Sequence, residues 1–472
     1  MANLDDSKAS ANPLRGTLNG EANVAVIGGG WAGLAAAVSL AESGARVTLF
    51  EAAQRLGGRA RSLPWPGPAA QGSALSPSES WPEIDNGQHV LIGACRATLT
   101  LLEHLGASLE HCFRRTPFAL ESDRGLRVRA ANLPAPWHLL HGLLTARGLS
   151  WAQRWQMTRF IRQLEKDDWT VNGQLTVRAL LGTAGQSKEL QKRFWDPLCV
   201  AALNTDPTEA CALTFTRVLR DSLGSDASAA DLLVPKVPLG ELLPSLARRF
   251  LSKRQGRLVV GHRVREIGWQ DGRLQIDQQG WDGAVLAVPS ANARSLVGPS
   301  IPELATESIL TVWVLCKPGT LADGLQLLLE DGPGEWLFTR TLDDQRILAS
   351  VVISATRKRS FDRTRVAEHC VAQIDRWLRQ NGYRRGLSAE DILRTTRIEE
   401  KSATFACFPG LERPAVDAVC DRFPTLMLAG DWTASEYPST LEAAVRSGQS
   451  AAHALARTLT RSGVLQTSQG QA

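Results

Sequence analysis

The stretch Gly28-Gly29-Gly30-Trp31-Ala32-Gly33 follows an apolar run, Val24 to Ile27, and precedes a stretch of small and apolar residues, Leu34 to Leu40. A second apolar strand, Arg46 to Phe50, comes next and ends at Glu51. Strand, glycine turn, helix, strand and acid in this order predict a nucleotide-binding βαβ unit.

Three glycines of this turn have distinct expected roles. Gly28 allows the tight turn, Gly30 lets backbone N–H groups approach a pyrophosphate, and Gly33 lets the helix pack closely on the sheet. The diphosphate would then rest on the positive end of that helix. Glu51, about 20 residues further on, would accept hydrogen bonds from a ribose hydroxyl and repel a 2′-phosphate. A glycine-rich turn without a ligand is the alternative.

A second glycine motif follows directly, Arg55-Leu56-Gly57-Gly58-Arg59-Ala60-Arg61-Ser62. A glycine pair followed by an arginine lets the main chain fold back over a diphosphate, while Arg59 supplies a charge-assisted hydrogen bond. Together with the first loop, this pattern is typical of flavoproteins.

The far end of the chain repeats the theme. Leu426 to Leu428 predicts a short buried strand, Ala429-Gly430-Asp431 follows it, and a helix is expected to begin near Thr440. Asp431 beside a strand end suits a ribityl hydroxyl, and the helix N-terminus suits the electron-rich N1/O2 edge of a flavin. Taken alone, the segment also fits an ordinary strand, turn and helix.

Four segments together carry a family resemblance that covers nearly the whole chain. They are Val24 to Ala60, Asp85-Asn86-Gly87-Gln88-His89-Val90-Leu91-Ile92-Gly93, Leu133 to Leu149, and Gly430-Asp431-Trp432-Thr433 with the following Tyr437 to Gly448. The chain resembles the amine oxidase and phytoene desaturase group of FAD enzymes, and within it the bacterial squalene-associated desaturases, or hydroxysqualene dehydroxylases. The glycine-rich ends are specific only for the superfamily, whereas the segments around His89 and Trp432 point to the squalene branch.

The resemblance implies an α/β fold with a Rossmann-like FAD-binding domain and a discontinuous α+β substrate domain. The two nucleotide motifs lie at opposite ends of the chain and must meet at one FAD. The expected pieces are 21–110, 236–295 and 405–460 for the FAD-binding domain, 111–235 and 296–404 for the substrate domain, a disordered tail at 1–20 and a flexible tail at 461–472. Strands are expected at Arg257–Val260, Val264–Trp269, Arg273–Ile276, Ser308–Cys316 and Arg346–Ile353.

Residues from both ends are expected to contact FAD, and Val264 is expected to offer its backbone to the adenine. The expected cofactor-binding residues are Gly28, Gly30, Trp31, Ala32, Gly33, Glu51, Gly57, Gly58, Arg59, Arg61, Gln88, His89, Val264, Gly430, Asp431, Thr440, Leu441 and Glu442.

Composition agrees with an enzyme of two domains. The 472 residues exceed the usual size of one core, and the apolar fraction of 43% is ample. The net charge of +5 is mild and no dense Lys/Arg tract occurs, so no nucleic-acid partner is expected. The eight cysteines show no CxxC or metal-type spacing, which predicts reduced thiols, no metal and a cytoplasmic location.

Targeting and membrane-spanning signals are not evident. Residues 1–20 lack the apolar core of a signal peptide, and no window reaches 18 uninterrupted apolar residues. The segment Pro64 to Pro82, rich in Pro, Gly, Ser and Ala, predicts a long surface loop.

Residues 137–166 are a candidate for peripheral contact with the inner face of the plasma membrane. Ser150-Trp151-Ala152-Gln153 predicts a capping box that opens a helix to about Lys166. One helix face is apolar and the opposite face is aromatic and cationic, which suits a lipid headgroup layer. The two faces consist of Met157, Phe160, Ile161 and Leu164, and of Trp151, Trp155, Arg159 and Arg162. Stacking of arginine on tryptophan within the substrate domain, or a helix buried on both sides, is the alternative.

The resemblance implies that reduced FAD gives hydride to the allylic carbon of hydroxysqualene as the hydroxyl leaves as water. Loss of hydroxide at neutral pH needs an acid, and the developing allylic cation needs a dry, electron-rich wall. His89 is the first candidate for the acid, because the family's Asp85 to Gly93 segment passes beside the flavin. A structural hydrogen-bond donor is the alternative role for His89.

Other candidate residues have weaker support. Trp432 and Tyr437 are expected to line the reacting face, with ordinary packing under the last helix as the alternative. Asp85 is expected to be a turn or flavin-loop residue. Two further carboxylates, Asp196 and Glu436, have no motif to support them, and Phe194 and Trp195 are candidates for a hydrocarbon channel or for the core.

Two absences narrow the reaction. Amine oxidases of the superfamily place an aromatic residue two positions before the helix glutamate to form half of a cage around the amine, and here that position is Thr440, which disfavours an amine substrate. The sequence has no second glycine-rich βαβ unit for NAD(P)H, so the electron donor is expected to be another protein, a quinone or free reduced flavin. A carotenoid-type FAD desaturase and a non-catalytic prenyl-binding escort module are the alternative functions.

Overall fold

The structure of the protein is a computed structural model that describes residues 18, 22–65, 81–131, 133, 137–223, 227–342, 344–381 and 386–461. The predicted tails lie outside these ranges except for Leu18 and Arg461, and most of the predicted loop 64–82 lies outside them too. Leu18 is fully buried, and its backbone N–H donates a hydrogen bond to the carbonyl oxygen of Ser43 (2.7 Å). The prediction of a disordered tail is therefore wrong at Leu18, because this residue packs into an apolar core.

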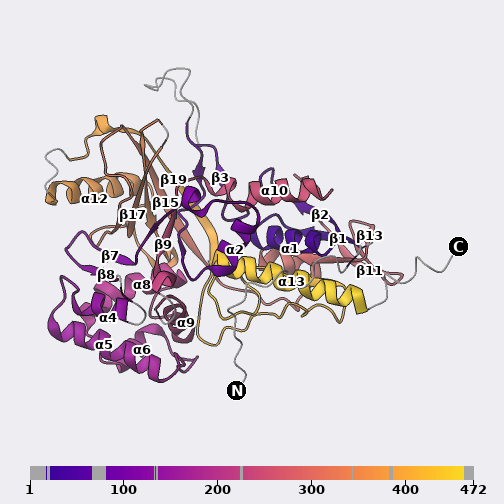
Figure 1. Ribbon diagram of the computed structural model, residues 1–472, viewed down its shortest axis with the longest axis horizontal. Coiled ribbons are helices and arrows are strands. Elements are labelled where there is room, and N and C mark those ends of the chain that lie inside the picture. The colour runs from indigo at the N-terminus through magenta and orange to yellow at the C-terminus, as the bar shows by residue number, and fades with distance from the viewer. Residues whose placement is uncertain are drawn as a thin grey trace.

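A parallel sheet of five strands is the centre of the Rossmann-like domain, and it confirms the predicted α/β fold class (Figure 1). Its strands lie in the order β10-β2-β1-β14-β20. They are β1 (Asn23–Ile27), β2 (Arg46–Glu51), β10 (Arg257–Val260), β14 (Gly283–Leu286) and β20 (Leu426–Leu428). Segments from the beginning, the middle and the end of the chain thus share one sheet.

The two faces of this sheet pack against different layers. Val24 and Val26 of β1 belong to the core formed with the helices, while Ala25 and Ile27 belong to the core on the opposite side. This alternation follows from the two-residue period of a strand. The helices that share the first core are α1 (Trp31–Glu42), α2 (Arg96–His104), α10 (Leu243–Lys253) and α13 (Leu441–Arg461).

The first and the last long helices, α1 and α13, pack backbone to backbone. A Cβ atom added at Gly448 of α13 would lie 2.1 Å from the carbonyl oxygen of Ala32 in α1. Only a glycine allows this approach, which brings the N-terminus of α13 beside the glycine turn before α1. Figure 1 shows the two helices side by side over the parallel sheet.

An antiparallel three-stranded sheet covers the other face. Its strands are β11 (Ile267–Gln270), β12 (Arg273–Ile276) and β13 (Gln279–Trp281). The predicted strand at Val264 begins three residues late, because the N–H groups of Arg265 and Glu266 donate to the carboxylate of Asp277 (2.9 and 3.1 Å) instead of to a neighbouring strand. The third strand was not predicted.

The second domain contains a five-stranded antiparallel sheet in the order β16-β17-β18-β15-β19, with helix α12 (Val366–Gln380) packed on it. The strands are β15 (Thr306–Cys316), β16 (Gln326–Leu328), β17 (Trp336–Thr341), β18 (Ile347–Ile353) and β19 (Ile392–Phe405). Both predicted strands of this domain are present, β15 beginning two residues earlier than predicted and β18 one residue later.

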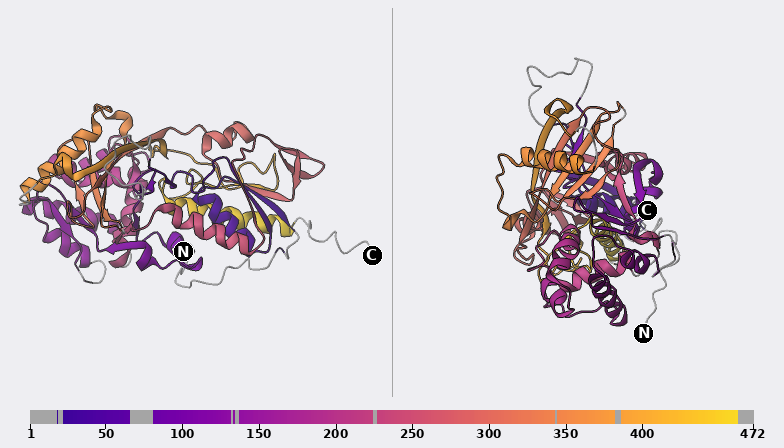
Figure 2. Two further views of the ribbon diagram at one scale, coloured as in Figure 1. Left: turned by 90° about the horizontal axis from the view of Figure 1, so that it is seen from above. Right: turned by 90° about the vertical axis from the view of Figure 1, so that its left-hand side faces the viewer.

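A group of helices lies next to this sheet and completes the second domain. They are α4 (Trp137–Leu144), α5 (Trp151–Lys166), α6 (Val177–Thr183), α7 (Lys188–Leu190), the π-helix η1 (Gln191–Trp195), α8 (Asp196–Leu203) and α9 (Ala212–Leu223). Figure 2 shows these helices, in magenta, and the antiparallel sheet, in orange, together at one end of the molecule. The parallel sheet and its helices occupy the other end.

The remaining elements are short. They are β3 (Ser62–Leu63), β4 (Ile84–Asp85), β5 (Leu91–Ile92), α3 (Leu109–Cys112), β6 (Phe113–Thr116), β7 (Ala119–Glu121), β8 (Arg127–Arg129), η2 (Ala227–Ala230), β9 (Leu232–Pro235), η3 (Leu239–Glu241), α11 (Ser290–Val297), η4 (Thr356–Lys358) and η5 (Ala389–Asp391). Among the described helices, none is both long and apolar enough to cross a bilayer.

Candidate functional site

A cavity of about 1420 Å³ extends from the glycine turn before α1 into the second domain. Pockets for one ligand usually measure roughly 300–1,000 Å³, so this cavity has room for a dinucleotide and a second large molecule. One end is lined by the backbone of both glycine motifs, and the other end is lined by apolar side chains of α5, α8 and α9. The apolar end includes Ile161, Leu198, Ala202, Phe215, Val218 and Leu219.

The two N-terminal glycine motifs lie against each other at the glycine end of the cavity. The N–H of Gly57 donates to the carbonyl oxygen of Gly29 (2.8 Å), which holds the second motif against the first. A Cβ atom added at Gly30 would meet only the Cα of Gly58, at 3.8 Å, so the absence of a side chain leaves open space on the cavity side. Gly30 is also the N-cap of α1 and no side chain caps it. The first N–H groups of α1 are thus available to an anion.

Gly28 and Gly33 have packing roles. Gly28 has a φ of +112°, and a Cβ atom there would lie 2.5 Å from the carbonyl oxygen of Ala287. A Cβ at Gly33 would lie 1.9 Å from the carbonyl oxygen of Gly28. Gly28 lines the cavity but Gly33 does not. Gly33 therefore supports the site by close helix packing, as the motif predicts.

Glu51 is held at the end of β2 with its carboxylate on the cavity wall. One carboxylate oxygen accepts a hydrogen bond from the N–H of Gly29 (2.6 Å) and the other from the N–H of Ala53 (2.7 Å). Each carboxylate oxygen has further lone pairs, so the group can still accept hydrogen bonds from a ribose.

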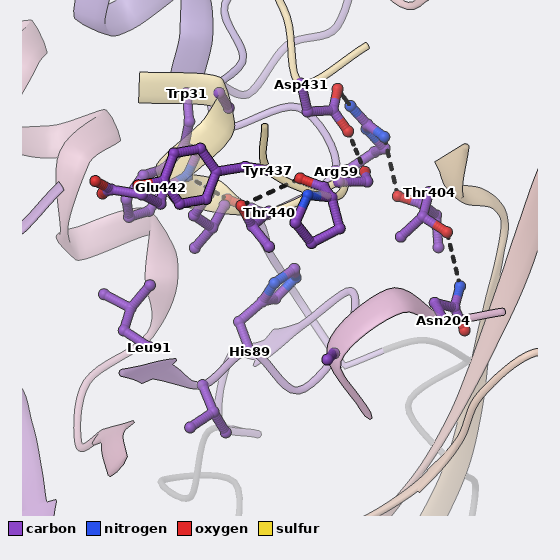
Figure 3. Close-up of a pocket in the computed structure, with 18 of the residues that line it drawn as sticks. Trp31, Arg59, His89, Leu91, Asn204, Thr404, Asp431, Tyr437, Thr440 and Glu442 are labelled. Atoms are coloured by element: carbon purple, nitrogen blue, oxygen red, sulfur yellow. Dashed lines mark hydrogen bonds and ion pairs between the residues drawn. The ribbon is translucent and has the colours of Figure 1, made fainter. Parts of the chain in front are cut away.

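Arg59 and Asp431 form an ion pair between the two ends of the chain (Figure 3). Asp431 is 3% exposed and also accepts a hydrogen bond from the hydroxyl of Ser439. A second nitrogen of Arg59 donates to the carbonyl oxygen of Ala403 (2.9 Å). The guanidinium group therefore joins the N-terminal motif to the C-terminal segment and to the end of β19.

His89 lines the cavity close to Arg59 (Figure 3). Burial, with the nearby positive charge of Arg59, lowers the pKa of His89 to about 4. The imidazole is therefore neutral near pH 7 and gains a proton only below about pH 4. A neutral imidazole is a hydrogen-bond partner rather than a strong acid, which does not suit the predicted role of His89 as general acid.

Trp432 and Tyr437 both line the cavity. The indole N–H of Trp432 donates to the carbonyl oxygen of Val288 (2.9 Å), so this ring is fixed against β14. The Tyr437 ring lies under the guanidinium of Arg446, 5.0 Å from the ring centre. Burial and the negative charge of Asp221 raise the pKa of Tyr437 to about 12, so its hydroxyl keeps its proton at neutral pH.

Three candidate carboxylates lie outside the cavity lining and have hydrogen-bond or ion-pair partners. Asp85 is held by the hydroxyl of Ser62 (2.7 Å) and the N–H of Leu239 (2.9 Å), and burial raises its pKa to about 6. Glu436 is exposed and pairs with Arg217 and Arg220. Asp196 pairs with Arg178 (2.8 Å). The lining of the cavity includes none of Asp85, Asp196 and Glu436.

A match to a known family decides the class of the protein. The family described as flavin containing amine oxidoreductase matches residues 31–456. The chain belongs to this family. It is an FAD-dependent oxidoreductase.

Similarity to proteins named as hydroxysqualene dehydroxylases extends over about nine tenths of the chain. The chain is 27% identical over 452 residues to a hydroxysqualene dehydroxylase from Zymomonas mobilis, which covers 90% of this chain and 97% of that protein. It is 28% identical over 446 residues to a hydroxysqualene dehydroxylase from Sinorhizobium fredii, and this match covers 91% of this chain and 97% of that protein. Cyclohexylamine oxidase from Brevibacterium oxydans shares the fold, with a TM-score of 0.64 at 17% identity over 93% of this chain and 99% of that one.

The residues at the glycine end fit FAD. The space beside Gly30, the uncapped N-terminus of α1 and the guanidinium of Arg59 suit a pyrophosphate, and Glu51 suits a ribose. The other predicted cofactor residues that line the same cavity are Trp31, Ala32, Gly57, Gly58, Arg61, Gln88, Val264, Gly430, Thr440 and Leu441.

Glu442 has a different set of partners from the predicted one. It is 2% exposed, and its carboxylate accepts hydrogen bonds from the N–H groups of Ala97 and Thr98 at the start of α2 (3.0 and 2.9 Å) and pairs with Arg446. A carboxylate at a helix N-terminus stabilises that helix. Glu442 thus ties α13 to α2, although part of its side chain lines the cavity.

Several polar residues of the cavity carry no sequence motif and were not predicted. Asn204 at the C-terminus of α8 and Thr404 near the end of β19 line the wall beside Arg59 (Figure 3). Glu400, which accepts a hydrogen bond from Asn86 (3.3 Å), lines it too. An Asn directly after an apolar helix predicts a left-handed C-cap, but nothing in the sequence places it beside a flavin. Among the described residues, no group of three or more His, Cys, Asp or Glu side chains could hold a metal ion.

The space beside Gly30 gives a test of the FAD site. We expect Gly30→Ala to weaken FAD binding at least about tenfold, because the methyl group occupies the position of the pyrophosphate. The melting temperature of the FAD-free protein should stay unchanged, because the backbone of Gly30 has a φ of −74° and the new Cβ meets no close atom. Flavin absorbance per protein and a thermal melt measure the two effects. Gly182→Ala, in open space on α6, is the control. Full flavin content in Gly30→Ala would contradict this assignment.

Proposed function

We propose that this protein reductively removes the hydroxyl group of hydroxysqualene to give squalene, as a step of squalene and hopanoid biosynthesis. The observation that supports it most is the continuous cavity, whose glycine end fits FAD and whose other end is apolar. The near full-length similarity to hydroxysqualene dehydroxylases agrees with this combination. Thr440, in place of the cage aromatic, disfavours an amine substrate.

The reaction replaces the carbon–oxygen bond at the allylic carbon with a carbon–hydrogen bond. FAD, when bound and reduced, supplies a hydride from N5, that is, a proton and two electrons. The hydroxyl leaves as water with one further proton, which the reduced flavin or the solvent would supply. The unidentified electron donor, which we propose to be a protein, a quinone or free reduced flavin, returns the two electrons for the next turnover.

The protein supplies a dry surrounding and fixed hydrogen-bond partners. Trp195 and Phe215 are buried on the cavity wall, and their ring faces can stabilise positive charge that develops on the allylic carbon. The lowered pKa of His89 leaves it without a second proton at neutral pH, and the raised pKa of Tyr437 makes its hydroxyl a weaker acid, so we assign both to positioning. Trp432 shapes the same end of the cavity.

Two alternative functions use the same fold. A carotenoid-type desaturase would run hydride transfer in the opposite direction, from an isoprenoid hydrocarbon to oxidised FAD. A prenyl-binding escort module would need no flavin. The glycine cradle with Glu51, Arg59 and Asp431 disfavours the escort function, because a carrier has no use for a pyrophosphate site.

We also propose that the protein is cytoplasmic and touches the inner face of the plasma membrane through residues 137–166. Helix α5 is amphipathic as predicted: its capping box is present, with Ser150 and Gln153 exchanging hydrogen bonds (2.9 and 3.2 Å). Trp151 and Trp155 are 74% and 61% exposed on its outer face. The guanidinium of Arg154 stacks on Trp151, 4.8 Å from the ring centre, as the alternative interpretation expected, but this stacking does not bury the tryptophan.

Charge favours an anionic bilayer as the partner of this surface. Helix α5 carries four cationic side chains and one carboxylate. The cationic side chains of Arg159, Arg162 and Lys166 are exposed, as are the two tryptophans. Exposed tryptophans among cationic groups suit the headgroup region. Two further exposed apolar side chains, Leu133 and Leu144, lie in the preceding segment.

A single turnover tests the proposed reaction. Anaerobically reduced protein mixed with hydroxysqualene in detergent should give one squalene per FAD while the flavin becomes oxidised, because the two electrons leave with the product. Lipid extraction and flavin absorbance measure the two amounts, and the Gly30→Ala protein without FAD is the control. Absence of squalene, or reduction of oxidised FAD by an isoprenoid hydrocarbon, would refute the dehydroxylase function.

A vesicle-binding assay tests the membrane surface. The double variant Trp151→Ser/Trp155→Ser should bind vesicles of phosphatidylcholine and phosphatidylglycerol at least about tenfold more weakly, because two apolar side chains no longer enter the headgroup layer. Trp269→Ser is the matched control, since Trp269 is also exposed but lies on β11 of the other domain. Equal binding of the double variant and the wild type would contradict the proposal.

A further inference from the structure

Asn204 and Thr404 form a polar spot on the cavity wall at the start of its apolar end. They are 5% and 8% exposed, and both line the cavity. The neighbours of Asn204 along α8 that line the same cavity are apolar, namely Leu198, Ala201, Ala202 and Leu203. Burying a polar atom in such a wall costs free energy unless that atom has a hydrogen-bond partner.

The hydrogen bonds of Asn204 fix the direction of its amide. Its Oδ1 accepts from the N–H of Ala355 (2.7 Å), and its Nδ2 donates to the hydroxyl oxygen of Thr404 (2.9 Å). A backbone N–H can only donate, so the amide cannot be reversed. The hydroxyl of Thr404 therefore accepts from Asn204 and keeps its own proton to donate. No described residue accepts a hydrogen bond from it.

The backbone around this pair is held in an unusual conformation. Asn204 and Ala355 both have a φ of +46°, in the left-handed region that an alanine rarely occupies. The hydrogen bond between Asn204 and Ala355 joins these two positions directly. Backbone strain of this kind is found where a structure fixes a functional group in place.

The pair lies where the FAD end meets the apolar end. Ala403, the residue before Thr404, accepts the hydrogen bond from Arg59, whose other nitrogen pairs with Asp431. Figure 3 shows Thr404 and Asn204 on the same side of the pocket as Arg59. A group bound by Thr404 would thus lie near both the cofactor residues and the hydrocarbon wall.

We propose that Thr404, oriented by Asn204, donates a hydrogen bond to the hydroxyl oxygen of an isoprenoid alcohol and so selects an alcohol over the corresponding hydrocarbon. This inference rests on the proposed function for the identity of the alcohol. A site built to hydrogen-bond a substrate hydroxyl discriminates strongly against the analogue that lacks it. It would also place the carbon that bears the hydroxyl, because the rest of a long hydrocarbon has no other polar group to fix its position.

Thr158 on α5 provides a matched control. It is also buried, its hydroxyl has no hydrogen-bond partner, and it lines the same cavity. It lies one helical turn from Arg162, an exposed residue that also lines the cavity. Thr158→Val and Thr404→Val therefore remove the same atom at two different places along the cavity.

The test is binding of hydroxysqualene and of squalene to the FAD-loaded protein in detergent, followed by flavin absorbance and tryptophan fluorescence. The wild type should bind the alcohol at least about tenfold more tightly than the hydrocarbon, and Thr404→Val should abolish most of this difference while the affinity for squalene stays unchanged. Thr404→Ser, which keeps the hydroxyl, should restore the preference. Thr158→Val should keep it.

The outcomes separate this site from the proposed reaction. If Thr404→Val weakens the binding of both ligands equally, Thr404 has only a structural role. If Thr158→Val loses the preference for the alcohol, the hydroxyl of the alcohol binds at Thr158 instead. Either result overturns the proposed role of Thr404. If the wild type makes squalene but Thr404→Val keeps the preference for the alcohol, the proposed role of Thr404 is wrong and the proposed reaction is supported. If the preference depends on Thr404 but no squalene forms, the site stands and the reaction falls.

Discussion

The ion pair between Arg59 and Asp431 joins residues 372 positions apart in the chain. Both belong to loops that follow strands of the parallel sheet, and the close packing of α13 on α1 at Gly448 brings these loops together. This pair of a half-buried arginine and a buried aspartate is better explained by the specific arrangement it imposes than by a large gain in stability. The FAD cradle exists only when both ends of the chain have folded onto the same sheet, and the same arginine also donates a hydrogen bond to Ala403, the residue before Thr404.

The sequence predicted the parts of the fold that local rules control. The glycine turn, the strands β1, β2, β10 and β20, and the capping box of α5 depend on neighbouring residues, so their patterns are readable. The predicted start of β11 was wrong because the carboxylate of Asp277, more than ten positions away, accepts hydrogen bonds from two backbone N–H groups. The prediction was wrong at Leu18 because scattered apolar residues in a polar tail give no pattern, although the core can still bury one of them.

The site was predictable only where a motif marks it. Gly28, Gly30, Glu51, Arg59 and Asp431 follow from glycine spacing and strand ends, and all of them line the cavity. The neutral state of His89 and the bonding of Glu442 to α2 depend on burial and on distant partners, which the sequence does not show. The pairing of Asn204 with Thr404 joins residues 200 positions apart, so only the folded chain reveals that an amide directs a hydroxyl toward the cavity.

One continuous cavity, with FAD at the glycine end and an isoprenoid at the apolar end, is the central claim. A crystal structure of the FAD-loaded protein with squalene tests it most directly. We expect the pyrophosphate against Gly30 and Gly58, and the hydrocarbon in the same cavity along Leu198, Ala202 and Phe215. Squalene bound outside this cavity, or FAD that extends through the apolar end and leaves no room for the hydrocarbon, would contradict it.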